Sequence, residues 1–169
     1  MIRLLGAVLV AAASAWLGLS AAAELGRRVR RLEALSAALE LLERELWERG
    51  APLPEVFQAL ARRTGEPAAA LFAHSARACL ALDREPFPAA WRRLVDGLEG
   101  VPREGRAALL PLGEVLGRYE AQGQREAIAQ SRSALERARR RAEEEKARMG
   151  RVYQALGLTG GGFLVILLL

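Results

Sequence analysis

Residues 24–49, ELGRRVRRLEALSAALELLERELWER, decide the fold class of this chain. Apolar side chains recur here at spacings of three and four, which is typical of an amphipathic helix. The stripe consists of Leu25, Val29, Leu32, Leu35, Leu39, Leu42 and Leu46. No proline stands between Ala23 and Arg49, so we expect one helix that ends at the Gly50-Ala51-Pro52 step.

The segment before this helix is apolar enough to cross a membrane. Residues 4–23, LLGAVLVAAASAWLGLSAAA, contain no charge over 20 residues, which corresponds to ~30 Å of helix. A cleaved signal peptide is the alternative, with a small-residue cleavage site at Ala21-Ala22-Ala23. The stretch exceeds the usual signal core of about 7 to 15 residues, and arginines follow it directly, which favours a retained membrane helix.

The other end of the chain predicts a second membrane helix. Residues 152–169, VYQALGLTGGGFLVILLL, carry no charge over 18 residues, which corresponds to ~27 Å of helix. Gly157 and Gly161 form one GxxxG spacing. Such a spacing lets another helix approach closely, so these glycines are the expected helix-packing residues.

The basic residues orient these two segments. Arg3 is the one charged side chain before Glu24, and no charge follows Arg151. A basic cluster follows the first segment, and a second basic group precedes the last one. The first is Arg27, Arg28, Arg30 and Arg31, and the second is Lys146, Arg148 and Arg151. By the positive-inside rule, residues 25–151 form a cytoplasmic domain between membrane helices at 1–24 and 152–169.

Prolines and glycines divide the middle of the chain into further helices. We expect a short helix over 54–63, one over about 68–83, a stripe led by Trp91, one over 103–118, and a last helix from near Gln122 into the tail. Pro111 should kink the fourth of these or begin a new one. The second should bury Leu71, Phe72, Ala78, Cys79 and Leu82. Alternating strand patterns are missing, so the predicted fold is all-α, a helical bundle flanked by the two membrane helices.

Composition excludes several functions. The net charge of +5 is local, because residues 32–151 hold 20 basic against 19 acidic side chains, and only 5% of the 169 residues are aromatic. This argues against nucleic-acid binding. Cys79 and His74 are the sole cysteine and histidine, which excludes an internal disulfide and a Cys/His zinc site. No catalytic set is visible, so we expect neither an enzyme nor a cofactor.

Several short motifs, in this order, cover nearly the whole chain. Trp16 with Gly18 lies in the first apolar segment, and Pro52-Leu53-Pro54 follows the leucine stripe. A paired Leu-Gly motif, LGEVLG, precedes a glutamine and the long last helix. The tail, LGLTGGGFLVILLL, has a Leu-Gly pair and another glycine four residues after the first. The motif residues are Leu112, Gly113, Leu116, Gly117 and Gln124. In this combination the chain resembles the stage III sporulation protein AB family of endospore-forming bacteria.

The resemblance implies a mother-cell membrane protein, within the channel that joins mother cell and forespore. It implies a helical domain similar to the platform protein of type II secretion and type IV pilus machines, and partners among the other stage III subunits, including the ATPase-like protein AA. The chain could also assemble with further copies of itself as a homo-oligomer. The motif residues would serve an interface or internal packing. Two alternatives remain: the platform of a secretion or pilus machine, and an exported helical protein released after Ala23.

Overall fold

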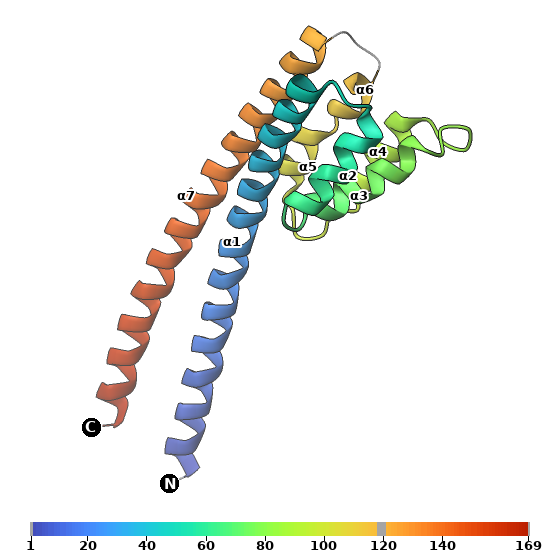
Figure 1. The fold of residues 1–169 in the computed structure, drawn as a ribbon. Coiled ribbons are helices and arrows are strands. Elements are labelled where there is room, and N and C mark those ends of the chain that lie inside the picture. The colour runs from blue at the N-terminus through green and yellow to red at the C-terminus, as the bar shows by residue number, and fades with distance from the viewer. Residues whose placement is uncertain (1, 118–120, 169) are drawn as a thin grey trace. The chain divides into compact units, whose positions relative to one another are not determined.

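The computed structural model describes the backbone of residues 2–117 and 121–168, and the side chains of residues 16, 20, 22–48, 50–117, 122–150 and 152. Every regular element in these ranges is a helix (Figure 1). The chain divides into two compact units, one formed by Arg28–Arg140 and the other by Met1–Arg27 with Arg141–Leu169. The all-α prediction is therefore confirmed for the part of the chain that is described.

Two long helices carry the two ends of the chain. Helix α1 spans Ile2–Arg49 and helix α7 spans Ala121–Leu168. Helix α1 ends at Arg49, as its sequence predicts, and Gly50 follows it with a φ of 55°, a left-handed conformation that glycine adopts without strain. Within the described side chains, no helix carries a stretch long and apolar enough to span a bilayer. The expected membrane segments lie largely outside those side chains.

Five short helices lie between the long ones, and a proline precedes each of them. They are α2 (Leu53–Arg63), α3 (Ala68–Cys79), α4 (Phe87–Asp96), α5 (Arg103–Leu109) and α6 (Leu112–Val115). The capping prolines are Pro52, Pro67, Pro86, Pro102 and Pro111. Proline fixes φ near the helical value and lacks the N–H that a first helical turn leaves unpaired, so it favours a helix start.

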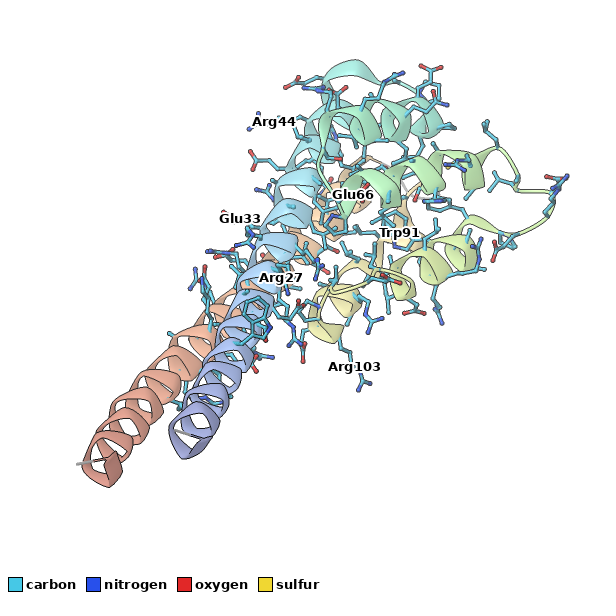
Figure 2. The ribbon with its side chains drawn as sticks, turned by 90° about the horizontal axis from the view of Figure 1, so that it is seen from below. Arg27, Glu33, Arg44, Glu66, Trp91 and Arg103 are labelled. Carbon is cyan, nitrogen blue, oxygen red and sulfur yellow. The ribbon has the colours of Figure 1, made fainter. Side chains whose placement is uncertain are left out.

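An aromatic cluster forms the core of the short helices. Phe57 of α2 stacks on Phe72 of α3, with 5.7 Å between ring centroids. Its ring also lies 6.0 Å from Phe87 and 6.3 Å from Trp91, both of α4. Trp91 is fully buried, and its Nε1 donates a hydrogen bond of 2.8 Å to the carbonyl of Leu109. Figure 2 shows Trp91 among the short helices. One residue therefore joins α4 to α5.

The leucine stripe of α1 is only partly buried. Its middle members, Leu32, Leu35, Leu39 and Leu42, are at most 2% exposed. Leu25, Val29 and Leu46 are half-buried. On α7, Ile128 and Leu135 are fully buried. The bundle core thus draws on the central part of the predicted stripe.

Two of the predicted helices differ from the observed ones. Helix α3 ends at Cys79 rather than near Asp83, and turns occupy residues 80–85. Leu82, predicted to be buried, is therefore 56% exposed, and Ala78 and Cys79 are half-buried. The region predicted as one helix over 103–118 forms α5 and α6 and ends at Val115, and the start of α6 after Pro111 is one of the two effects predicted for that proline. Proline cannot donate a helical hydrogen bond, which explains the break.

Candidate functional site

A polar clamp joins α1 to α7 within the unit Arg28–Arg140. Arg132 of α7 donates from Nη1 to Oε2 of Glu43 at 3.1 Å and from Nη2 to Oε2 of Glu40 at 3.2 Å. The two glutamates lie three residues apart on one face of α1. A guanidinium presents two donors in a fixed plane, so a single arginine can bind both carboxylates.

Two further contacts hold the last turns of α1. The guanidinium carbon of Arg125 lies 4.6 Å from the centre of the Trp47 ring, a cation–π geometry. Glu45 is buried and forms an ion pair with Arg63 of α2. These contacts are polar, whereas the centre of the stripe is apolar, so the end of α1 is fixed mainly by charged groups.

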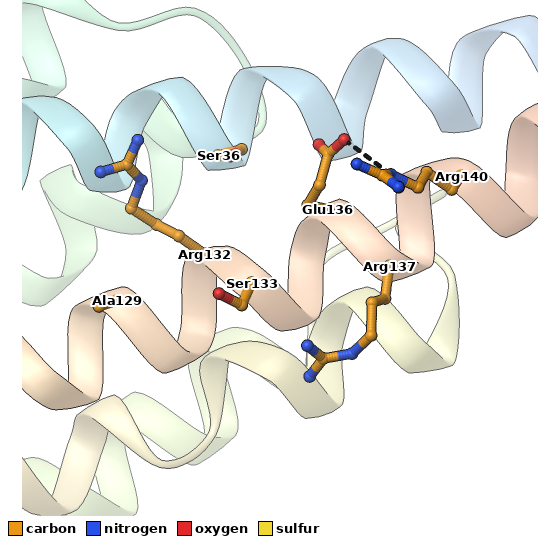
Figure 3. Close-up of a pocket in the computed structure, with 7 residues that line it drawn as sticks. All are labelled: Ser36, Ala129, Arg132, Ser133, Glu136, Arg137 and Arg140. Atoms are coloured by element: carbon orange, nitrogen blue, oxygen red, sulfur yellow. Dashed lines mark hydrogen bonds and ion pairs between the residues drawn. The ribbon is translucent and has the colours of Figure 1, made fainter.

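A shallow groove of about 650 Å³ lies along α1 and α7 beside the clamp. Its lining is shown in Figure 3 and consists of Ser36, Ala129, Arg132, Ser133, Glu136, Arg137 and Arg140. Arg132 and Glu136 point toward α1, whereas Arg137 points away from it. The middle of the groove therefore presents small side chains, and its edges carry charged ones.

Three arginine hydrogen bonds surround Glu136 and fix its charge. Arg139 donates from Nη2 at 2.8 Å and from Nε at 2.9 Å, and Arg140 donates from Nε at 3.3 Å. The hydrogen bonds from Arg139 lower the pKa of the Glu136 carboxyl to about 2, with a smaller contribution from Arg140. Glu136 and Arg140 lie four residues apart on α7, a spacing at which opposite charges on one helix pair.

This pKa gives the Glu136 contacts a defined pH dependence. The pKa in the folded chain is lower than the usual 4.5, so the stabilisation is complete above pH 4.5 and is lost as the pH falls toward 2. We expect an NMR titration of the Glu136 side chain in the full chain in detergent to have its midpoint near 2. Glu136→Gln removes the signal and serves as the control. A midpoint near 4.5 would contradict the contacts.

A second, apolar groove of about 410 Å³ lies among the short helices. Its lining includes Leu53, Leu82, Phe87 and Leu116, and the half-buried Cys79. Burial raises the pKa of the Cys79 thiol to about 11, so the thiol stays protonated and weakly reactive at neutral pH. Within the described residues, no three metal-binding side chains gather at one place.

The predicted basic cluster makes several separate contacts. Arg27 pairs with Glu24 of the preceding turn at 2.8 Å. Arg31 donates from Nη1 to the carbonyl of Gly100 at 3.1 Å, and a Cβ at Gly100 would lie 1.8 Å from that nitrogen. Arg30 is exposed and Arg28 is half-buried. The position of this cluster at a membrane boundary stays a prediction, and Arg31 in addition holds the loop that precedes α5.

The Leu-Gly motif lies against the core. Leu112 and Leu116 are at most 2% exposed. A Cβ on Gly113 would lie 2.6 Å from Cδ1 of Trp91, so only glycine fits there without a shift. Gly117 has a φ of 80°, which also favours glycine. We therefore propose that this motif serves internal packing.

The remaining predicted residues are placed less fully. Gln124 is half-buried near the start of α7. Gly157 and Gly161 lie on the backbone of α7, outside the residues whose surroundings are described. Their role in helix packing stays a prediction. The polar clamp and the groove were not predicted from the sequence, although the small residues Ala129 and Ser133, spaced by four, were a signal for a close approach.

The clamp can be tested by substituting its arginine. Arg132→Ala removes this cation from Glu43 and leaves Glu40 with Arg44, and we expect it to weaken α1 locally by about 1 kcal/mol because the groups are about one-third exposed or more. Hydrogen exchange of the α1 amides in the full chain in detergent measures this loss. Arg44→Ala is the matched control, since Arg44 pairs with Glu40 within the same helix, which contributes only about 0.3 kcal/mol. Equal effects of both variants would contradict the clamp.

Known proteins are similar to this chain in sequence and in fold. The family model for stage III sporulation protein AB matches residues 3–169. The chain is 29% identical over 175 residues to stage III sporulation protein AB of Bacillus subtilis (strain 168), and the alignment covers the whole of both chains. A solved structure of stage III sporulation protein AB superposes with a TM-score of 0.62 at 25% identity, over 72% of this chain and 98% of the other.

Proposed function

Because the chain belongs to the stage III sporulation protein AB family, and thus to the sporulation machinery, we propose that it is a non-enzymatic membrane platform. In this proposal, helices at residues 1–24 and 152–169 anchor it in the mother-cell membrane facing the forespore. Residues 25–151 form the cytoplasmic domain, which presents a helical bundle to other stage III subunits. The ATPase-like protein AA is the proposed docking partner.

The division of the chain into two units is the main support for this proposal. Both ends belong to one unit, and the whole middle, Arg28–Arg140, belongs to the other. Two uncharged ends that gather in one unit suit a pair of membrane helices, and a charged middle that forms its own core suits a domain in water. The basic cluster at residues 27–31 supports a cytoplasmic position for that domain.

A reporter fused after Gly50 tests the orientation. We expect a reporter that works only in the cytoplasm to be active when it is fused at this position. Activity of a reporter that works only outside the cytoplasm would overturn the orientation and the ATPase contact together. N-terminal sequencing of the native protein tests the anchor, because a protein that starts at Glu24 has lost its first apolar segment and is exported.

Crosslinking in sporulating cells tests the partner. We expect the ATPase-like protein to be recovered with the full chain after crosslinking and purification in detergent. A chain that lacks α2–α6 but keeps both ends is the control for non-specific capture in the membrane. Equal recovery with both chains would count against docking by the bundle.

A further inference from the structure

The face of α7 at the groove has no described covering element. Ala129, Ser133 and Arg137 are all exposed and follow one another at spacings of four, so they lie on one side of the helix. Ser36 of α1 lines the same groove from across it (Figure 3). The small side chains of Ala129, Ser133 and Ser36 let a further helix approach to an axis distance of about 8 Å, the close end of the usual range.

The charges at this groove are unbalanced. Arg132 is neutralised by Glu40 and Glu43. Arg140 lines the groove and pairs with Glu136, the one carboxylate in the lining, which Arg139 also binds. Arg137 is exposed, and no ion pair joins it to an acidic group among the described side chains. The edge of the groove therefore carries more positive than negative charge, next to a floor of small residues.

We infer that this groove docks an acidic helix of a different protein. The inference rests on the proposed platform function and names the chemistry of its partner. The small side chains of Ala129 and Ser133 admit the backbone of that helix. Glutamates or aspartates on its near side meet Arg137 and Arg140, whose excess charge is thereby neutralised.

A second copy of the chain fits this groove poorly. Two copies anchored in one membrane with the same orientation would meet about a two-fold axis, and an isologous interface at this face brings the same patch of each copy together. Two patches that each hold Arg137 and Arg140 with one carboxylate would then face each other. Like charges opposed across an interface disfavour association, so the charge pattern selects a partner of opposite charge.

A photocrosslinker at Gln130 tests the inference in the full chain. Gln130 is exposed one turn before Ser133, so p-benzoyl-phenylalanine there borders the groove without filling it. Gln58, exposed on α2, is the control position. In sporulating cells we expect an adduct at position 130 whose mass-spectrometric peptide is an acidic helical segment of another protein. No such adduct is expected at position 58.

Charge reversal then tests the recognition. We expect Arg137→Glu to lower the yield of this adduct about tenfold, and a basic substitution of the contacting acidic residue in the partner to restore it. Arg92→Glu, an exposed arginine of α4, should leave the yield unchanged. Arg137 is exposed, so its substitution leaves the core intact, which circular dichroism checks.

Several results would overturn the inference. One is an adduct at position 130 with a second copy of the chain, with lipid or with a non-acidic segment. Another is an adduct yield that Arg137→Glu does not change. A third is an adduct yield at position 130 no higher than the yield at position 58. Failure here is distinguishable from failure of the platform function. If the reporter after Gly50 is active in the cytoplasm but no adduct forms at position 130, only the proposed role of the groove is wrong. If an adduct forms but the reporter is active outside the cytoplasm, the proposed platform function is wrong.

Discussion

Replacing Trp91 by alanine is expected to lower the free energy of unfolding of the Arg28–Arg140 unit by about 3–5 kcal/mol. The ring is fully buried and stacks near Phe57 and Phe87. Its removal leaves a cavity in the centre of the aromatic cluster. It also leaves the buried carbonyl of Leu109 without the indole N–H that it accepts, which adds a desolvation cost.

Hydrogen exchange of the full chain in detergent measures this loss at the amides of α3 and α4. A drop of this size speeds their exchange by about 10² to 10⁴-fold. The exchange rate of Trp91→Phe should lie between those of the unchanged chain and Trp91→Ala, because phenylalanine keeps much of the ring volume but loses the hydrogen bond. Trp16→Ala is the matched control, since Trp16 is 75% exposed and belongs to the other unit. Similar exchange in all three variants would contradict the central position of Trp91.

Gly113→Ala is the substitution with the second-largest expected effect. The new methyl group would lie 2.6 Å from Cδ1, 2.9 Å from Cγ and 3.0 Å from Cβ of Trp91. The tryptophan cannot move away easily, because neighbouring rings and its hydrogen bond hold it. Overpacking of this kind costs about 1–3 kcal/mol, although alanine is normally the better helix former at an exposed position.

A double-mutant cycle separates this clash from a general effect on α6. If the cost arises at Trp91, Gly113→Ala should cost much less in a Trp91→Ala background, since alanine lacks Cδ1 and Cγ, the two atoms closest to the new methyl group. Gly65→Ala is the control, because a Cβ there meets no atom within 4 Å. Purely additive effects would show that Gly113 and Trp91 do not share the contact. The same exchange measurement at α4 reports all of these variants.

The sequence predicts the helices of this fold better than their ends. Leucines at helical spacing and prolines ahead of each short helix are local signals, and α1 ends at Arg49 as expected. The end of α3 is not a local matter. Residues 80–83 are apolar enough to continue a helix, but the chain turns there to bring Phe87 onto Phe57, so Leu82 is left exposed.

The site is less predictable than the fold because its contacts join distant residues. The sequence around Gly113 does not predict that Trp91 lies next to it, and the sequence around Arg31 does not predict its contact with Gly100. The charged stretch around Glu136 has the sequence pattern of a helix surface in water. Its local pair with Arg140 could be predicted from spacing. The pairing of Arg132 with glutamates of α1 could not.

The clamp also constrains how the protein is made. Arg132 and Glu40 are 92 residues apart in sequence, and a ribosome needs about 5 to 20 s to add that many residues. The leucines of α1 are therefore made well before Ile128 and Leu135 of α7, and the contacts between the two helices form only late in translation.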